Sequence, residues 1–176
     1  VGQAFDDDGE PLLLDALASQ STLPKTSFLY SPSFGQARLR EVWRKRIQEN
    51  NQTLRTRTTL PIVTAGITHG LSTIKRLFVD DGDAIISPDK FWGNYTLIFD
   101  NAAFDTFPLF DSGFNIAGLA AKLSAAGAKK IVLLNFPNNP TGYTPTDEEA
   151  QGIVDAIHHA AKEGKNIVVI CGVSQH

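Results

Sequence analysis

The chain has 176 residues and an ordinary globular composition, with 42% hydrophobic, 20% charged and 9% aromatic positions. Its formal net charge of -3 gives it no overall attraction to nucleic acid or to an anionic membrane. Its apolar runs are far shorter than the roughly 20 residues that span a bilayer. We expect no secretory signal, because no basic segment followed by an apolar one opens the sequence. The single cysteine, Cys171, cannot form an internal disulfide, and we therefore expect a cytoplasmic protein.

Helical and strand-like patterns alternate along the chain. In chain order they predict a helix at 36–50, a strand at 61–65, a helix at 67–79, strands at 84–87 and 104–109, a helix at 115–126, a strand at 130–135, a helix at 146–163 and a strand at 167–171. This alternation indicates an α/β layer fold with a largely parallel sheet.

Capping signals fix the ends of two of these helices. Thr146 and Glu149 stand at the spacing of a capping box, and Gly164 marks the end of the same helix. Asn115 is the expected N-cap of the preceding helix, and Gly127 its stop.

A small-residue turn precedes the predicted helix at 67–79. The first turn of a helix leaves backbone N–H groups unpaired at the positive end of its dipole. Gly66 and Ile67 belong to this turn, and Thr68 adds a hydroxyl. The turn therefore suits a phosphate group, although its spacing is neither that of a P-loop nor that of a dinucleotide fingerprint.

Two further segments follow predicted strands, where ligand crevices of open α/β sheets lie. Trp92 follows the strand at 84–87. Its ring could stack on a flat heterocycle or simply pack against the core, and the sequence leaves both alternatives open. Asn139 lies in a loop stiffened by Pro137 and Pro140, which suits it to hold an amide against a ligand.

These motifs together resemble a known family. Asn-Asn-Pro-Thr-Gly at 138–142, Trp-Gly-Asn at 92–94 and the turn at Gly66 are similar to those of fold-type I pyridoxal-phosphate-dependent aminotransferases, especially the aspartate and aromatic branch. The segment 30–35, followed by Arg40, resembles the family's tyrosine-containing loop.

The resemblance implies a three-layer α/β/α large domain of the PLP-transferase type, present in part. Residues 1–50 would form the N-terminal segment and the start of the small-domain or linker region, and residues 51–176 part of the cofactor-binding large domain. The implied reaction is transamination of an amino acid to a 2-oxo acid, with pyridoxal 5'-phosphate as cofactor.

The resemblance also implies a role for each matching residue. The cofactor phosphate would be bound by Gly66, Ile67 and Thr68. Trp92 would stack on the pyridine ring, and Asn139 would donate to the phenolic oxygen. Tyr30 would reach the phosphate bound by a second subunit, and Gly35 would lie near the substrate carboxylate. The role of Tyr30 implies a homodimer.

The chain departs from the family after Cys171. Family members carry Asp-x-x-Tyr there, and the Asp pairs with the pyridinium nitrogen, whereas this chain has Gly172 to Gln175. The Schiff-base lysine lies further along in the family, and no lysine here matches it. We therefore expect no catalytic residue in this chain and negligible activity of the chain alone.

Other functions stay open at this point. A pyridoxal-phosphate-dependent carbon–sulfur lyase would share these motifs, and so would a non-catalytic binding domain on the same scaffold. Ser72 and Lys75 match the Ser-x-x-Lys pattern of some serine hydrolases, but the companion motifs are absent and helical periodicity accounts for both. The basic residues between Arg38 and Arg46 fit a solvated helix face better than a nucleic-acid stripe.

Overall fold

The computed structural model describes residues 5–11, 16, 23, 29–52, 54 and 58–173. The chain divides into two compact units, the first ending at Ala65 and the second beginning at Gly66. Among the described residues, none of the helices combines the length and apolarity needed to cross a bilayer.

The first unit contains helix α2 (Ala37–Asn50), which confirms the predicted helix at 36–50. The predicted strand at 61–65 is wrong, because this segment forms no sheet ladder. The N–H of Val63 donates to the carbonyl of Phe34 at 3.1 Å, and the Nε of Arg40 donates to the carbonyl of Pro61 at 2.6 Å. Pro61 has no N–H to offer a ladder, so one backbone bond and one side-chain bond hold this segment instead.

The second unit contains a four-stranded sheet in which every neighbouring pair is parallel, in the order β2-β1-β3-β4. Its elements in chain order are α3 (Ile67–Phe78), β1 (Ala84–Pro88), α4 (Tyr95–Ile98), β2 (Ala103–Phe107), α5 (Ile116–Ser124), β3 (Lys129–Asn135), α6 (Asp147–Lys162) and β4 (Asn166–Gly172). The predicted α/β fold with a mostly parallel sheet is confirmed. Among these elements of the second unit, α4 alone has no counterpart in the prediction, because four residues are too few to show a helical period.

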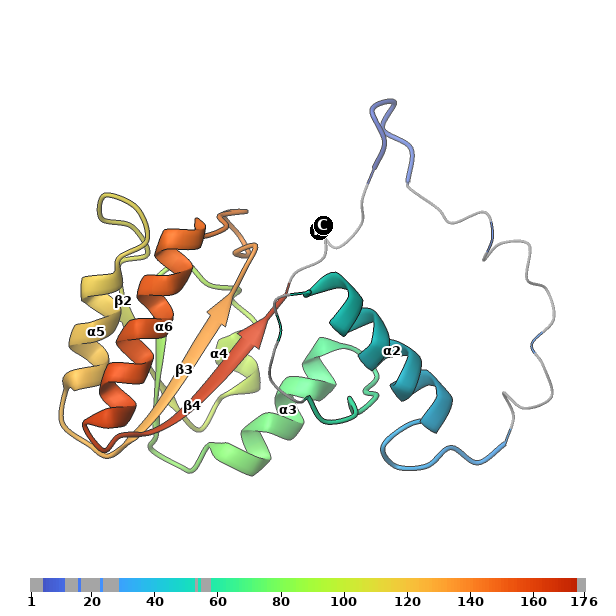
Figure 1. Ribbon diagram of the computed structural model, residues 1–176, viewed down its shortest axis with the longest axis horizontal. Helices are drawn as coiled ribbons and strands as arrows, with labels where there is room; N and C mark the ends of the chain where they lie inside the picture. Colours follow the sequence, from blue (N-terminus) through green and yellow to red (C-terminus); the bar gives the residue numbers. More distant parts are fainter. Residues whose placement is uncertain are drawn as a thin grey trace. The chain divides into compact units, whose positions relative to one another are not determined.

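Helices cover both faces of this sheet, with α5 and α6 on one face and α3 and α4 on the other (Figure 1). Successive side chains of a strand point to opposite faces. Val132 and Leu134 of β3 therefore pack with α5 and α6, while Ile131 and Leu133 pack with α3 and α4. All four are at most 4% exposed, and burying one such side chain contributes about 1.5–3 kcal/mol.

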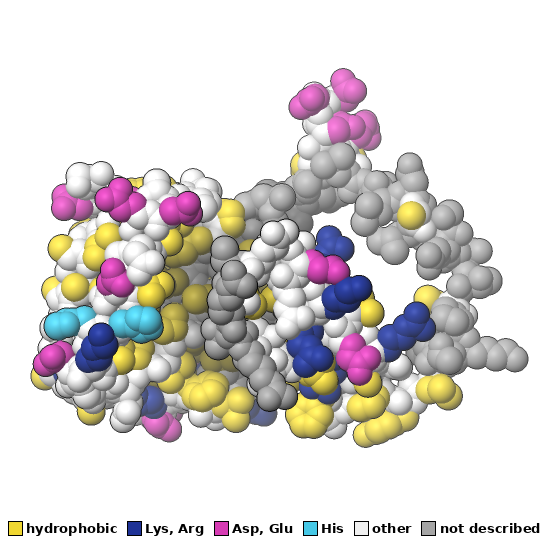
Figure 2. All heavy atoms as spheres, viewed as in Figure 1, with side chains coloured by type: hydrophobic (Ala, Val, Ile, Leu, Met, Phe, Trp, Pro, Cys, Tyr) yellow, Lys and Arg dark blue, Asp and Glu magenta, His cyan; other side chains and the backbone are white. Residues whose placement is uncertain are grey.

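The charge pattern of α6 follows its helix dipole. Its first turn carries Asp147, Glu148 and Glu149, and its last turn carries His159 and Lys162. Figure 2 shows the same separation, with acidic side chains at the end where α6 begins and histidine toward the other end. Negative charge at a helix N-terminus and positive charge at its C-terminus stabilise the helix.

The predicted capping box is confirmed and extends beyond the helix. The side chain of Thr146 accepts from the N–H of Glu149 at 3.2 Å. Glu149 Oε2 accepts from the N–H of Thr146 at 2.8 Å and from the hydroxyl of Tyr143 at 2.6 Å. Glu149 Oε1 accepts from the N–H of Phe114 at 2.6 Å. The hydroxyl of Tyr143 first, and then these backbone donors, lower the pKa of Glu149 to about 2.

This lowered pKa predicts an acid-sensitive contribution to stability. A carboxylate whose pKa is lower in the folded chain stabilises the fold above its unfolded pKa, about 4.3, and loses that contribution as the pH falls toward 2. We expect Glu149→Gln to lower the free energy of unfolding at pH 7 and to flatten its decline between about pH 5 and pH 2. Denaturation followed by circular dichroism across this range measures both effects.

Glu148→Gln is the matched control, because it removes the same charge from the same helical turn. Glu148 is exposed and makes none of the hydrogen bonds of Glu149. If both variants changed the free energy of unfolding between about pH 5 and pH 2 by the same amount, the role given to the hydrogen bonds of Glu149 would be contradicted.

Candidate functional site

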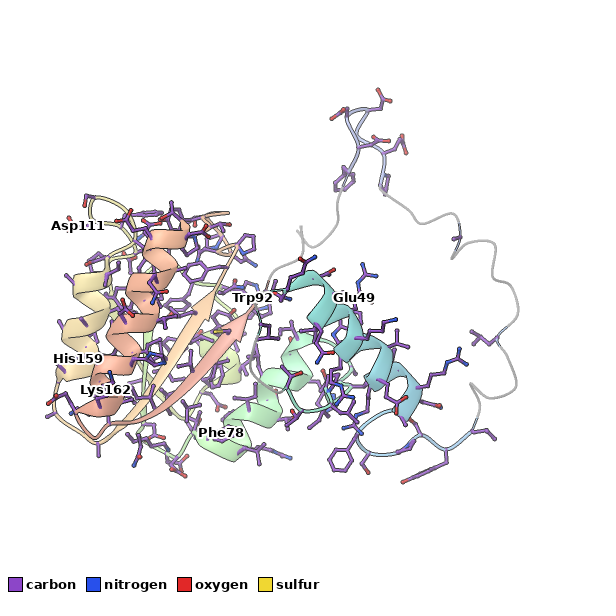
Figure 3. The ribbon with its side chains drawn as sticks, in the orientation of Figure 1. Glu49, Phe78, Trp92, Asp111, His159 and Lys162 are labelled. Atoms are coloured by element: carbon purple, nitrogen blue, oxygen red, sulfur yellow. The ribbon has the colours of Figure 1, made fainter. Side chains whose placement is uncertain are left out.

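The carboxyl ends of the parallel strands meet at one edge of the sheet, where open α/β folds place their ligands. The segment beginning at Asp89 follows β1, and the segment beginning at Phe136 follows β3, its neighbour in the sheet. Figure 3 shows Trp92 at the carboxyl ends of β3 and β4, with His159 and Lys162 toward the opposite end. The sequence-predicted segments around Trp92 and Asn139 therefore lie at the same edge.

A buried amide joins these two segments. Asn138 is only 2% exposed, and its Nδ2 donates to the carbonyl of Lys90 at 3.0 Å. Its Oδ1 accepts from the hydroxyl of Thr141 at 2.7 Å and from the N–H of Thr141 at 3.3 Å. Lys90 is two residues before Trp92, and Asn138 is adjacent to Asn139. This side chain therefore fixes the two segments relative to each other.

Trp92 is half-buried against the core on the α3 and α4 side of the sheet. Its ring meets the ring of Tyr95 edge to face, with centroids 5.5 Å apart. Leu71, from the first half of α3, belongs to the same cluster. Packing holds the indole, and among the described residues its N–H has no hydrogen-bond acceptor. Trp92 therefore packs on one side and keeps a free polar edge.

Asn139 is positioned through its backbone. Its N–H donates to Oδ1 of Asn135 at 3.2 Å. Within the described part of the chain, its side-chain amide makes no hydrogen bond and is half-buried. An amide placed by the backbone and left unpaired is suited to donate to a ligand.

The turn before α3 has the geometry expected of an anion site. Gly66 is the N-cap with φ of +93°, a conformation that favours glycine, and no heavy atom lies within 4 Å of where its Cβ would be. Helix geometry leaves the N–H groups of Ile67 and Thr68 without an acceptor inside the helix. The hydroxyl of Thr68 is exposed, and among the described residues it has no partner.

Gly172, the last residue of β4, faces two polar side chains that sequence reasoning missed. A Cβ built there would lie 3.1 Å from Nδ2 of Asn135 and 3.5 Å from the hydroxyl oxygen of Tyr95. Tyr95 is 5% exposed, and burial raises its pKa. A side chain at position 172 would therefore point at Tyr95 and Asn135, but the glycine leaves this position without a carboxylate.

Tyr30 and Gly35 belong to the first unit. Tyr30 is 93% exposed. Gly35 has φ of +90°, and a Cβ there would come within 2.4 Å of Cγ2 of Val63, so only glycine fits. The loop around Gly35 is also held by the bond from its N–H to the carbonyl of Pro32 at 2.8 Å.

The serine hydrolase alternative finds no support in the geometry. The hydroxyl of Ser72 donates to the carbonyl of Thr68 at 2.8 Å, one helical turn back. Lys75 forms an ion pair with Asp100. Both groups of the proposed pair are therefore engaged elsewhere.

The residues present fit pyridoxal phosphate in three respects. The start of α3 offers backbone donors and a hydroxyl for the phosphate, Trp92 offers a ring, and Asn139 offers an unpaired amide. Gly172, beside Asn135 and Tyr95, supplies no negative charge to such a ligand.

The fold and the edge define an open parallel α/β protein whose candidate ligand site lies at the carboxyl ends of β1 and β3. The chain belongs to the aminotransferase class I and II family, whose model matches residues 2–170. Pyridoxal 5'-phosphate is the cofactor of this family.

Two curated relatives indicate the branch of the family. The aspartate aminotransferase of Geobacillus stearothermophilus is 30% identical over 129 residues, which are 70% of this chain and 32% of that protein. A probable aspartate/prephenate aminotransferase of Aquifex aeolicus is 26% identical over 129 residues, covering 72% of this chain and 32% of the relative. The chain thus spans about a third of the length of these relatives.

Solved structures share the fold. An aminotransferase from Anaerococcus prevotii gives a TM-score of 0.83 at 24% identity, covering 97% of this chain and 44% of that one. A K237A mutant of the mitochondrial aspartate aminotransferase from Trypanosoma brucei gives 0.75 at 25% identity, covering 97% of this chain and 46% of that one.

The buried amide of Asn138 predicts a stability effect confined to this residue. Asn138→Ala removes its side-chain hydrogen bonds and leaves the carbonyl of Lys90 unpaired, at a cost of roughly 1–3 kcal/mol. Asn139→Ala, in the same loop, should change stability by less than about 0.5 kcal/mol. Chemical denaturation of both variants measures the difference, and equal losses would contradict the role given to Asn138.

Proposed function

We propose that this chain is the N-terminal part of a pyridoxal-phosphate-dependent aminotransferase, which moves an amino group between an amino acid and a 2-oxo acid. The observation that carries the proposal is the Asn138 bridge, which holds the segments of Trp92 and Asn139 at one edge of the sheet. Family membership over residues 2–170 supports the same conclusion.

Each residue would have one task. The N–H groups at Gly66, Ile67 and Thr68, with the Thr68 hydroxyl, would bind the phosphate dianion at the positive end of α3. Trp92 would hold one face of the ring and exclude water from it. Asn139 would donate its amide proton to the phenolic oxygen. When bound, the cofactor supplies an electron sink for negative charge on the substrate.

The first unit would complete the site in a homodimer. Tyr30 would reach the phosphate bound by a second copy of the chain, which accords with its high exposure in the single chain. Gly35 would lie near the substrate carboxylate. Aspartate, named in several relatives, is the proposed amino acid substrate, and the cytoplasm is the proposed compartment.

Cofactor binding tests the proposal. We expect the full-length protein to bind pyridoxal phosphate and quench tryptophan fluorescence, and we expect Asn139→Ala to weaken binding about tenfold, as for the loss of one hydrogen bond to a charged group. Trp92→Phe should remove most of the quenching. Trp43→Phe, in α2, is the matched control and should keep the affinity. No binding at millimolar cofactor would refute the proposal.

We also propose that the 176-residue chain alone has negligible transaminase activity, because no lysine in it matches the family's Schiff-base lysine and Gly172 replaces the family's aspartate. A coupled assay with aspartate and a 2-oxo acid should give no turnover by the purified chain. Turnover above the free-cofactor rate would contradict this expectation.

The glycine at position 172 favours one second candidate, a non-catalytic binding domain on the same scaffold. Borohydride reduction of the cofactor-loaded full-length protein separates the two. In an enzyme the cofactor becomes fixed to a lysine and adds its mass to one peptide, whereas in a binding domain it does not. A carbon–sulfur lyase would give the enzyme result and differ only in its products.

A further inference from the structure

We propose that Tyr143 is a positioning residue for Asn139: its hydroxyl ties the loop between β3 and α6 to Glu149 and so sets the amide that meets the cofactor. The inference rests on the proposed function, because it concerns the contact between Asn139 and the phenolic oxygen.

The loop from residue 138 to residue 143 is closed on itself. The N–H of Asn138 donates to the carbonyl of Tyr143 at 2.7 Å, and the N–H of Gly142 donates to the carbonyl of Asn138 at 2.6 Å. Asn139 lies inside this closed segment. Any displacement of Tyr143 is therefore passed to Asn138 and to its neighbour.

Tyr143 is held from two sides. Its hydroxyl donates to Oε2 of Glu149 at 2.6 Å, and its ring meets the ring of Phe110 edge to face at 4.9 Å. The bond to the carboxylate raises the pKa of Tyr143, so the hydroxyl keeps its proton and stays a donor at neutral pH. A charged acceptor makes this hydrogen bond stronger than a neutral one.

Glu149 is itself fixed to the scaffold. The capping box ties it to the start of α6 through Thr146, and the N–H of Phe114 holds its other oxygen. A Cβ at Gly113 would come within 2.4 Å of Oε1, so the backbone before Phe114 approaches this carboxylate closely. The hydroxyl of Tyr143 therefore reaches an anchor shared by α6 and the segment before α5.

The bond from Tyr143 shares Oε2 of Glu149 with the capping box, but it can be removed without removing the cap. A capping box needs only Thr146 and Glu149, and Tyr143 adds no donor to the helix end. The hydroxyl thus acts on the loop, while Thr146 acts on the helix. Since the side chain of Asn139 has no hydrogen bond within the described residues, the loop sets where its amide lies.

A ligand pair that differs only at the phenolic oxygen tests the inference. We compare the affinities of the full-length protein for pyridoxal phosphate and for its 3-deoxy analogue by fluorescence titration. We expect a preference of about tenfold for pyridoxal phosphate, the value of one well-formed hydrogen bond. Asn139→Ala should abolish the preference, and Tyr143→Phe should reduce it to less than about threefold.

Thr146→Ala is the control for a purely structural effect. It should lower the melting temperature through the lost cap but keep the tenfold preference. If Tyr143→Phe does not fold, Glu149→Gln weakens the same bond from the acceptor side and should also reduce the preference.

The outcomes separate the inference from the proposed function. If the unmodified protein binds neither ligand, the proposed function fails and the inference fails with it. If it shows the preference and the folded Tyr143→Phe or Glu149→Gln variant keeps it in full, the inference is overturned while the proposed function stands. Equal loss of preference in Thr146→Ala would overturn it as well.

Discussion

The hydrogen bond from the buried side chain of Asn138 to the carbonyl of Lys90 joins the segments that follow two neighbouring strands. Parallel pairing of β1 and β3 brings the ends of these strands to one edge, but it does not fix the polar segments beyond them. A buried amide that lost its partners would cost free energy, so this bond holds Trp92 and Asn139 in one arrangement. The candidate site depends on it.

The same edge carries a glycine, Gly172, at the end of β4. Position 172 is the last residue of β4, and a side chain there would point at Asn135 and Tyr95. Glycine leaves that position uncharged, while the first turn of α3 offers backbone N–H donors and Trp92 offers an aromatic ring.

Local signals in the sequence predicted most of the fold. The capping box at Thr146 and the N-cap at Asn115 are set by residues within one helical turn, and the structure bears out both. The strand expected at 61–65 is absent, because Pro61 has no N–H for a sheet ladder and its carbonyl accepts a bond from the side chain of Arg40. Asn138 belongs to the motif at 138–142, but its bond to Lys90 spans two segments and no local pattern predicts it. The contacts of Tyr143 with Phe110 and of Glu149 with Phe114 are likewise invisible in the sequence. The sequence predicts that Glu149 caps α6, but it does not predict that the same carboxylate holds the loop through Tyr143.

A crystal structure of the full-length protein with pyridoxal phosphate tests the central claim most directly. We expect the pyridine ring against Trp92, the phenolic oxygen within hydrogen-bond distance of Asn139, and the phosphate on the first turn of α3. A cofactor bound elsewhere, with Trp92 and Asn139 turned away from it, would contradict the account.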